Sequence, residues 1–288
     1  MESERFHGSC SRNTSNDSVS QLKMVSRREI LAKKKAIQEL IKAAYFVKDH
    51  IAFFPSFCHY DKNGLSVYLE SGRGDKLSIT VKNYVQNLLK QNMEGHYGSE
   101  WLVEEKVKRR ETVAPEARYI FVHEVTNTNF NERTAMLIGE KTSASLENSG
   151  PLVGFVQYRF IVEEDIPVLY VYELQLEPRI QGKGLGKFLM QLIELIAQKN
   201  CMGAVMLTVQ KKNLFAMNFY INKMRYNIST MSPSKVNPMI GKESSYEILC
   251  KTFNEEAKTK LELCSKVVSS FVWLDCMCPP RDFRTYLC

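Results

Sequence analysis

The sequence predicts an α/β domain in which helices flank a mixed central β-sheet. Two long apolar runs, 152–162 and 167–177, are joined by the acidic turn EEDI and indicate an antiparallel hairpin. Strand and helix patterns alternate after this hairpin, which indicates crossover connections. The stretch RIQGKGLGKFL (179–189) places three glycines directly before a helical pattern, so it is the first candidate for a ligand site.

The periodicity of the apolar residues predicts each element in turn. A long N-terminal helix is expected over 27–51, on a stripe of Ile30, Ile37, Leu40, Ile41, Ala44 and Val47. Before the hairpin we expect a helix at 78–94 and strands at 65–72 and 118–125. After the hairpin we expect helices at 185–199 and 213–224 and strands at 203–209 and 245–251.

Composition divides the chain into three parts. Residues 1–22 are rich in Ser and Asn and are expected to be a disordered N-terminal segment. Residues 23–255 hold the predicted elements and are expected to form one domain, interrupted by a polar loop at 126–150. Residues 256–288 are expected to be a loose tail. Its Cys276 and Cys278 have no histidine nearby, so we expect no metal site.

The totals narrow the class of protein. Of 288 residues, 44% are hydrophobic and 25% charged, which is ordinary for a soluble globular protein. We see no secretory signal, no membrane-spanning run and no disulfide framework among the eight cysteines, so reduced thiols in the nucleus and cytoplasm are expected. The net charge of +7 favours an anionic ligand or partner. The stretch RREILAKKK (27–35) is either a nuclear localisation patch or a solvated helix face.

The glycine stretch is compared with three kinds of phosphate loop. A P-loop needs a hydroxyl residue where this chain has Phe188, which argues against a nucleotide hydrolase. The dinucleotide fingerprint fits only if Lys187 replaces its last glycine. The pattern that remains is Gln-x-x-Gly-x-Gly over 181–186. A phosphate loop and a structural turn that contains glycines are both open on this stretch alone.

The Gln-x-x-Gly-x-Gly pattern resembles the pyrophosphate loop of the GNAT acetyltransferases, which bind coenzyme A. Asn213, Ala216 and Tyr220 also fit that superfamily's Asn-x-x-Ala-x-x-x-Tyr helix. Over about 27–251 the chain resembles the NatD type of N-terminal α-amino acetyltransferase, in the stretches FPSFCHYDKNGLSVYLESG, YGSEW, YVYELQLE, GKGLGKFL, VMLTV and SYEIL. The resemblance implies the GNAT acyl-CoA N-acyltransferase fold with an extra N-terminal helix. It also implies acetyl transfer to the N-terminal serine of histone tails that begin Ser-Gly-Arg-Gly.

The resemblance assigns the cofactor contacts, with acetyl-CoA as co-substrate and no metal. The backbone of Leu174, Gln175 and Leu176 would pair with the pantetheine arm, and Asn213 would touch the cofactor. The pyrophosphate would be held by Gln181, Gly182, Lys183, Gly184, Leu185, Gly186 and Lys187.

Two residues are candidates for proton transfer. An α-amino group has a pKa of about 7.7–8.0, so a base of modest strength is enough. Glu173 lies between apolar strand residues and beside Tyr172, where a carboxylate partly removed from water would act as the general base. Its alternative is a solvent-facing or merely hydrogen-bonded glutamate. Tyr220 is either the acid that protonates the leaving thiolate or a packed aromatic residue.

The substrate residues also come from the resemblance. The peptide groove would be lined by Tyr97, Tyr172, Thr208 and Tyr246, with Trp101 and Tyr170 at its mouth and Met231 and Ser232 closing over it. Ile161, Val162 and Glu163 would contact the peptide at the hairpin turn. The related enzymes tend to carry an acidic residue where this chain has Ile161, so Glu163 or Asp165 would have to read the substrate arginine.

Histone tails are thus the expected partner of a monomeric enzyme that contacts neither nucleic acid nor membrane. A lysine or small-amine acetyltransferase on the same fold is the alternative, because fold does not fix substrate. A binder of acetyl-CoA without chemistry is a third possibility, against which Glu173, Tyr172 and the intact glycine stretch argue.

Overall fold

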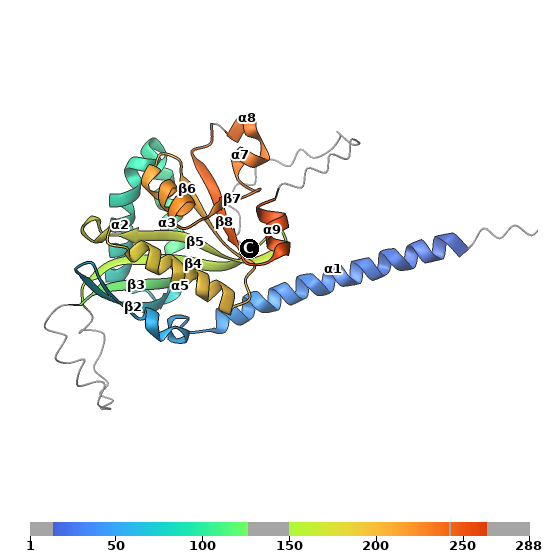
Figure 1. The fold of residues 1–288 in the computed structure, drawn as a ribbon, viewed down its shortest axis with the longest axis horizontal. Helices are drawn as coiled ribbons and strands as arrows, with labels where there is room; N and C mark the ends of the chain where they lie inside the picture. The colour runs from blue at the N-terminus through green and yellow to red at the C-terminus, as the bar shows by residue number, and fades with distance from the viewer. Residues whose placement is uncertain (1–13, 126–149, 242, 264–288) are drawn as a thin grey trace, which may run out of the picture.

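The computed structural model describes residues 14–125, 150–241 and 243–263. Within them lies one eight-stranded sheet. Its strands are β1 (His59–Lys62), β2 (Leu65–Arg73), β3 (Arg118–Glu124), β4 (Leu152–Glu163), β5 (Ile166–Leu176), β6 (Ala204–Gln210), β7 (Asn227–Ile228) and β8 (Tyr246–Thr252). The spatial order is β1-β2-β3-β4-β5-β6-β8-β7, so the strands follow chain order except that β8 lies between β6 and β7 (Figure 1).

Neighbouring strands are antiparallel except β5 and β6, which are parallel. The predicted hairpin is β4–β5, which pairs from Gly154 opposite Leu176 to Glu163 opposite Ile166. Its turn is two residues long, and both Glu164 and Asp165 have positive φ (47° and 57°). Two such residues form the type I′ turn that suits the twist of paired strands. The mixed sheet is therefore confirmed.

Helices cover both faces of the sheet. They are α1 (Thr14–Phe46), α2 (Ile79–Tyr97), α3 (Trp101–Val113), α5 (Leu185–Lys199), α6 (Leu214–Asn218), α7 (Pro233–Val236), α8 (Pro238–Gly241) and α9 (Glu255–Leu261). Short 3₁₀ turns occur at Ile51–Phe53, Pro55–Phe57, Gly74–Lys76, Gly98–Glu100 and Pro178–Ile180, and a π-helical turn, Phe219–Lys223, continues α6. Figure 1 shows α5 on one face of the sheet and α2 and α3 on the opposite face.

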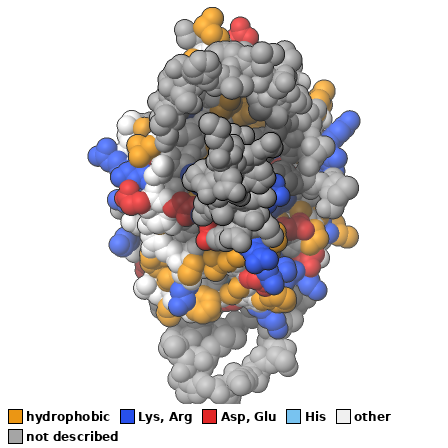
Figure 2. Space-filling view, turned by 90° about the vertical axis from the view of Figure 1, so that its right-hand side faces the viewer, with side chains coloured by type: hydrophobic (Ala, Val, Ile, Leu, Met, Phe, Trp, Pro, Cys, Tyr) orange, Lys and Arg blue, Asp and Glu red, His pale blue; other side chains and the backbone are white. Residues whose placement is uncertain are grey.

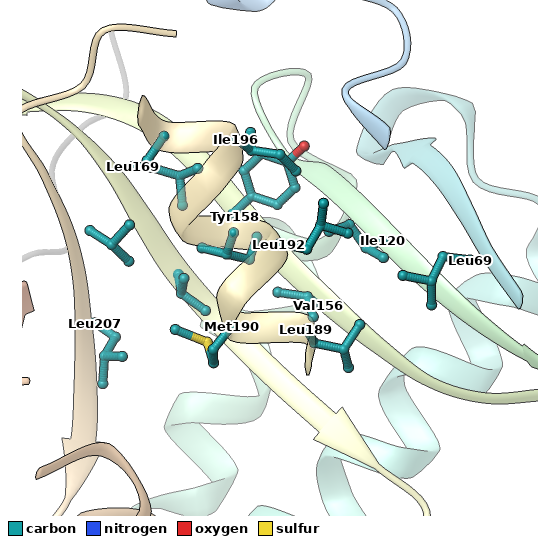
Figure 3. Packing of buried hydrophobic residues seen from close by; sticks show 14 of the residues in the cluster. Leu69, Ile120, Val156, Tyr158, Leu169, Leu189, Met190, Leu192, Ile196 and Leu207 are labelled. Atoms are coloured by element: carbon teal, nitrogen blue, oxygen red, sulfur yellow. The ribbon is translucent and has the colours of Figure 1, made fainter. Parts of the chain in front are cut away.

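The main core lies between α5 and the sheet. Along α5, Leu185, Leu189, Leu192, Ile193 and Ile196 are all buried, as the helical period of the sequence predicts. They pack on residues such as Ile120, Val156, Leu169 and Leu207 from four strands (Figure 3). A separate cluster on the opposite face joins α2 and α3 to β3 and β4 through Val85, Leu89, Trp101, Tyr119 and Phe155. The two helical layers therefore fix the sheet from both sides.

The N-terminal helix differs from its predicted bounds. α1 starts at Thr14 rather than Arg27, so the expectation of disorder is wrong for residues 14–22. Helix propagation adds one hydrogen bond for each residue fixed, so a helix anchored at its C-terminal end extends through a Ser-rich stretch. Ile37, Ile41 and Ala44 are buried, whereas Ile30 is exposed. Residues 1–13 lie outside the described part.

The C-terminal boundary is also corrected. α9 falls in the predicted tail, yet Ala257 and Leu261 are fully buried against β6 and β8. The backbone N–H of Thr230 donates to the Leu261 carbonyl oxygen at 2.8 Å, and the Asn254 side chain caps the helix. The folded domain therefore continues through α9. The expectations for the tail beyond residue 263, with Cys276 and Cys278, and for loop 126–149 lie outside the described residues.

No described helix is both long and apolar enough to cross a bilayer. No cluster of three or more His, Cys, Asp or Glu side chains suited to a metal ion occurs in the described ranges. Cys58, Cys201 and Cys250 are free thiols.

Candidate active site

The site begins where β5 parts from β6. The parallel pairing of these strands runs from Val168 to Val171 of β5 and ends there. At the same place the pairing with β4 shifts: Gln157 is opposite Glu173, but Tyr158 is opposite Val171, so Tyr172 is an extra residue. This is a β-bulge, which re-aims side chains and bends a strand. The edge of β5 after Tyr172 is thereby open toward β6.

Backbone alternation shows which peptide groups face this open edge. The Glu177 N–H donates to the Val153 carbonyl oxygen at 2.9 Å, so Gln175 and Glu173 also exchange hydrogen bonds with β4. Leu174 and Leu176 therefore direct their peptide groups away from β4, as expected for pantetheine contacts, but the Leu176 carbonyl oxygen already accepts hydrogen bonds from Asn92 and Gln181. For Gln175 the expectation is wrong, because its peptide groups face β4 and its side chain lies in the site described below.

The glycine stretch has the backbone that the sequence predicts. Gly182 and Gly184 have φ of +74° and +90°, a region that favours glycine. From the β1–β2 hairpin, the Tyr60 Oη and Asn63 Nδ2 donate to the Lys183 carbonyl oxygen at 2.5 Å and 2.8 Å. This side of the loop is braced by protein, so the N–H groups at the start of α5 form the opposite side.

Those N–H groups are the ones a helix start leaves without intrahelical partners. The first intrahelical bond of α5 is made by Phe188 to Gly184, which leaves the N–H groups of Leu185, Gly186 and Lys187 for an anion. Gln181 instead braces the loop, since its Nε2 donates to the Leu176 carbonyl oxygen and its backbone N–H to Pro178. Asn213 caps α6 through its Oδ1, so only its amide nitrogen is left for a cofactor.

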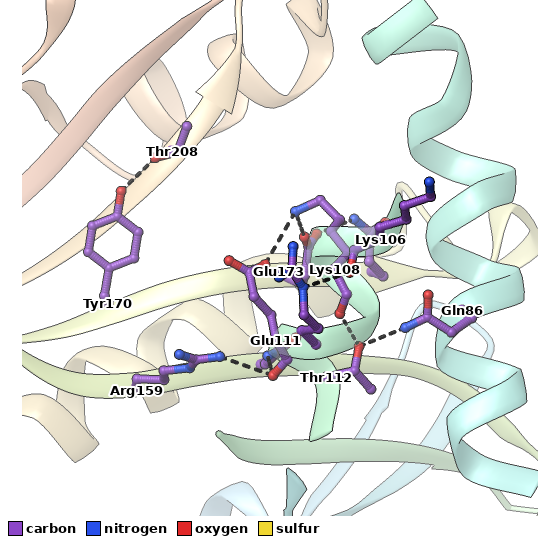
Figure 4. A network of polar contacts seen from close by, with 12 residues as sticks. Gln86, Lys106, Lys108, Glu111, Thr112, Arg159, Tyr170, Glu173 and Thr208 are labelled. Carbon is purple, nitrogen blue, oxygen red and sulfur yellow. Dashed lines mark hydrogen bonds and ion pairs between the residues drawn. The ribbon is translucent and has the colours of Figure 1, made fainter. Parts of the chain in front are cut away.

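Glu173 is the centre of a buried polar network. Its side chain is only 6% exposed, and the Lys108 ammonium of α3 lies 2.5 Å from its Oε1. The Gln175 Nε2 donates to the other oxygen, Oε2, at 2.8 Å, and Asn92 of α2 donates to Gln175 Oε1. Figure 4 shows Lys108 reaching from α3 toward Glu173. Glu173 is thus neither solvent-facing nor simply desolvated, because it has a buried counter-ion.

The Lys108 ammonium keeps its charge in the fold. Burial opposes the charged form of Lys108, but Glu173, Tyr97 and Glu111 overcome this effect and raise the pKa of Lys108. Glu111, one turn further along α3, lies 4.0 Å from the same ammonium. Burial raises the pKa of Glu111, Lys108 opposes the rise and Glu173 adds to it.

Tyr220 approaches Glu173 from the other face of the sheet. Its ring lies in the core under the π-helical turn, beside Phe219 and Tyr226. Burial raises the pKa of Tyr220, and the negative charge of Glu173 adds to the rise. A tyrosine that keeps its proton suits a general acid, and the packed position suits the alternative, so its catalytic role stays a prediction.

Beside Glu173 lies a set of side chains that we name the tyrosine surface: Ile161, Tyr170, Tyr172, Thr208, Met231 and Tyr246. The Tyr170 Oη and Thr208 Oγ1 are 2.5 Å apart, and the Arg159 guanidinium lies 4.4 Å from the centre of the Tyr172 ring. Tyr172, Met231, Ile161 and Tyr246 pack on one apolar cluster below them. Tyr97 lies on the far side of Lys108, 5.7 Å from its ammonium. Six of the predicted peptide residues therefore share one face of the sheet, and their contact with a peptide stays a prediction.

Three predicted substrate residues do not fit direct contact. Val162 packs against the α1 and α5 side of the sheet, because it alternates with Ile161. Ser232 is fully buried, and its Oγ donates to Glu247 and accepts from the Ile248 N–H, so it ties the α7 segment to β8. Trp101 is only 3% exposed, although its buried Nε1–H has no partner among the described residues.

The acidic turn separates into two roles. Glu163 lies near the tyrosine surface, where its charge contributes to raising the pKa of Tyr170 and Tyr172 after the larger effect of burial. Asp165 points to the other side, 3.8 Å from the Lys34 ammonium of α1, and Lys33 pairs with Glu256 nearby. On the side of the molecule from which α1 projects, basic and acidic side chains lie next to one another (Figure 2).

This geometry can be compared with known proteins. Residues 99–224 match the model of the acetyltransferase (GNAT) family. The chain has the GNAT fold. The matched segment contains Lys108, the open edge of β5, Glu173, the glycine stretch and Tyr220, so the GNAT prediction is confirmed for the segment in which the candidate site lies. Acetyl-CoA as co-substrate agrees with this match, and the positive-φ glycines, the α5 N–H groups, the peptide groups of Leu174 and the backbone N–H of Leu176 fit it.

Solved structures give similar GNAT proteins. The PaiA N-acetyltransferase of Thermoplasma acidophilum in complex with coenzyme A is 16% identical over 64% of this chain and 99% of that chain, with a TM-score of 0.41. The Arabidopsis thaliana NAA60 in complex with a bisubstrate analogue is 12% identical over 65% and 99%, with a TM-score of 0.42. A GNAT acetyltransferase of Listeria monocytogenes is 11% identical over 68% and 99%, with a TM-score of 0.41.

Sequence reasoning missed four parts of the candidate site: Tyr60, Asn63, Lys108 and Glu111. A tyrosine and an asparagine in a short hairpin give no signal that they brace a loop about 120 residues away. Lys108 lies in a strongly charged helix, where a lysine normally points to solvent. The spacing of Lys108 and Glu111, three apart, was a usable signal that both share one helix face.

Proposed function

We propose that this protein is an N-terminal α-amino acetyltransferase of the NatD type, which moves acetyl from acetyl-CoA to the N-terminal serine of histone tails that begin Ser-Gly-Arg-Gly. The observation that carries the proposal is the buried carboxylate of Glu173, placed on a bulge between the open edge of β5 and the tyrosine surface. On one side of it lie the groups that fit acetyl-CoA, and on the other lie aromatic side chains suited to a peptide backbone.

When bound, acetyl-CoA supplies a thioester carbonyl. The substrate amine forms a C–N bond to the carbonyl carbon, the C–S bond breaks, and the products are the acetylated N-terminus and free coenzyme A. Glu173 takes the proton that the amine nitrogen releases, and the Tyr220 hydroxyl gives a proton to the departing sulfur. A thiol has a pKa of about 8.5, so its thiolate leaves with little assistance. Leu174 orients the cofactor through its peptide groups, and Leu176 does so through its backbone N–H.

The state of Glu173 favours an α-amine over a lysine side chain. Both of its oxygens already accept hydrogen bonds, one of them from the Lys108 ammonium, whose positive charge disfavours a second ammonium beside it. An α-amine, with a pKa of about 7.7–8.0, is partly neutral at pH 7, whereas a lysine amine near 10.4 is almost wholly protonated. The lysine or small-amine enzyme is the alternative that the experiment below distinguishes.

Selection of an arginine at the third position is assigned to Glu163. This carboxylate lies by the tyrosine surface, whereas Asp165 has Lys34 as its neighbour. Ile161, on the same face of β4, adds an apolar contact in place of the acidic residue that related enzymes tend to carry there. We further propose that the enzyme works as a monomer in the nucleus and cytoplasm, with histone tails as its partner and without contact to nucleic acid or membrane.

The experiment compares four peptides in an assay of coenzyme A release: Ser-Gly-Arg-Gly with a free N-terminus, the same peptide blocked there, an Arg-to-Ala version, and a blocked lysine peptide. Mass spectrometry then locates the acetyl group. The proposal expects release only with free N-termini, and best with arginine present. Release with the blocked lysine peptide would instead support the alternative, and equal rates with arginine and alanine would overturn the histone assignment.

A further inference from the structure

We infer that Lys108 is a positioning residue for the reaction: its buried ammonium fixes the Glu173 carboxylate in a single orientation and supplies its counter-charge. The inference rests on the proposed role of Glu173 and assigns a residue that does not itself touch the substrate. The ammonium of a lysine side chain is rarely buried without a specific partner. Lys108 is 11% exposed and lies 2.5 Å from Glu173.

Contacts with β4 and α2 hold α3 in the position from which Lys108 reaches Glu173. The carbonyl oxygen of Glu111, near the C-terminal end of α3, accepts hydrogen bonds from Gln157 Nε2 and an Arg159 Nη2 of β4, at 2.9 Å and 3.0 Å. Thr112 is held by Gln86 of α2 and bonds back to the Lys108 carbonyl oxygen. Helix α3 is thus fixed to β4 and α2 within one turn of Lys108. Its ammonium therefore has a defined position over β5 (Figure 4).

Glu173 is correspondingly held from two directions. Lys108 donates to Oε1 of Glu173, and Gln175 donates to Oε2. Asn92 in turn donates to the side-chain oxygen of Gln175. A carboxylate has about four acceptor sites, so two are left for the substrate amine. The bulge at Tyr172 orients the backbone, and the two donors fix the remaining rotation of the side chain. Loss of Lys108 releases one of the two oxygens and leaves a buried carboxylate without its counter-ion.

Other ionisable groups around the pair do not replace this charge. They come from α2, α3, β3, β4, β5 and the turn after α6, and they are Tyr97, Glu104, Glu111, Tyr119, Arg159, Tyr172 and Tyr220. Only Arg159 is cationic among them, and it is engaged with the Tyr172 ring and the Glu111 carbonyl oxygen. Lys108 is therefore the ammonium that compensates Glu173.

The test uses K108M, which keeps the length of the side chain without its charge, and K108R, which keeps the charge. The control is K106M, since Lys106 is an exposed lysine on the same helix. Both kcat and KM for the Ser-Gly-Arg-Gly peptide are measured between pH 6 and 9.5. We expect K108M to lower kcat about 100-fold with little change in KM, and K106M to match wild type. The acid limb of the K108M profile should move to higher pH, and K108R should recover part of kcat.

A double variant, K108M with E173Q, decides whether Lys108 acts through Glu173. In that case the double variant is within about threefold of E173Q alone, because the carboxylate to be positioned is already gone. Losses that multiply, or a K108M enzyme with the kcat and pH profile of wild type, would overturn the inference.

Urea unfolding of wild type, K108M, E173Q and the double variant separates this inference from the proposed function. If Lys108 and Glu173 act as an ion pair, the changes in unfolding free energy caused by K108M and E173Q do not add in the double variant. Unfolding is measured without any substrate. Additive effects overturn the inference whichever amine the enzyme acetylates. A wild type that shows the coupling but modifies a different amine overturns only the proposed substrate, and the kcat comparisons are then made with that amine.

Discussion

The three glycines of the loop before α5 should respond differently to alanine, because the structure gives each a different surrounding. A Cβ at Gly184 would lie 2.7 Å from the Tyr60 hydroxyl, whereas at Gly182 it would meet nothing within 4 Å. At Gly186 the nearest atom is in the Phe219 ring, at an ordinary 3.6 Å. Gly182 and Gly184 have positive φ, and Gly186 lies within α5. One substitution therefore has three expected results.

The magnitudes follow from these geometries. A left-handed backbone costs an L-residue about 1–2 kcal/mol, which is the whole effect expected for G182A. G184A carries the same cost and also displaces the Tyr60 hydroxyl from the Lys183 carbonyl oxygen, a hydrogen bond worth about 1 kcal/mol. Its total is therefore about 2–3 kcal/mol. G186A should stabilise the protein by about 0.5–1 kcal/mol, since alanine is the better helix residue.

Urea unfolding measures how much stability G184A loses, and calorimetric titration with acetyl-CoA measures how much affinity it loses. A loop that keeps its shape shows the strain as lost stability, and a loop that relaxes shows it as lost affinity, at tenfold for each 1.4 kcal/mol. The sum of the two losses should be about 2–3 kcal/mol. A G184A protein that matches G186A in both measurements would refute the assignment of a strained, braced loop. The variant Y60F, which lacks the hydroxyl, should relieve the part of the G184A effect that comes from the clash.

Four further predictions concern other parts of the molecule. E173Q should lower kcat about 10²–10⁴-fold and leave acetyl-CoA affinity nearly unchanged, and a rate within about threefold of wild type at neutral pH would remove Glu173 from its role. E163Q should raise KM for the Ser-Gly-Arg-Gly peptide roughly tenfold, as expected for the loss of a charged hydrogen bond. D165N should leave KM unchanged, because Asp165 lies beside Lys34. Equal effects of the two substitutions would contradict the separate roles of Glu163 and Asp165. L261A should lower the unfolding free energy by about 2–5 kcal/mol, since Leu261 is fully buried. An unchanged urea midpoint would contradict the conclusion that α9 is part of the folded domain. Burial, with the charge of Arg118 adding to it, lowers the pKa of His50 to about 4, so the native state binds fewer protons than the unfolded chain and stability falls as the pH drops from about 6.5 to about 4. The loss should reach about 2 kcal/mol by pH 5, and H50Q should show a flatter dependence between pH 7 and 5 in urea unfolding.

Periodicity was enough to predict the strands β2 to β6 and β8 and the helices α2 and α5, because their burial is set by local pattern. α9 was missed although its signals were present, namely the cap Asn254 and the pair Ala257 and Leu261 four residues apart. Helix α3 was missed because its apolar pattern is weak, and charged residues dominate it.

The candidate site was predictable only where it is local. The glycine stretch and Glu173 stand out in the sequence, since special backbone and an isolated carboxylate in an apolar strand are visible there. The ion pair of Glu173 joins residues 65 positions apart, and the bulge depends on how β5 aligns with β4. Simple alternation would place Tyr172 and Glu173 on opposite faces, whereas the bulge lets both serve one site. Long-range packing and strand register are not encoded in any short stretch.

The bulge at Tyr172 makes this residue an insertion in an otherwise regular strand. Val171 faces α5 and Glu173 faces α3, so the inward and outward alternation of β5 is continuous if Tyr172 is passed over. A chain lacking this one residue would retain the ladder to β4 and the buried face against α5, yet it would lose the divergence from β6. The ladder of the sheet and the open edge of the candidate site therefore depend on different features of the same strand.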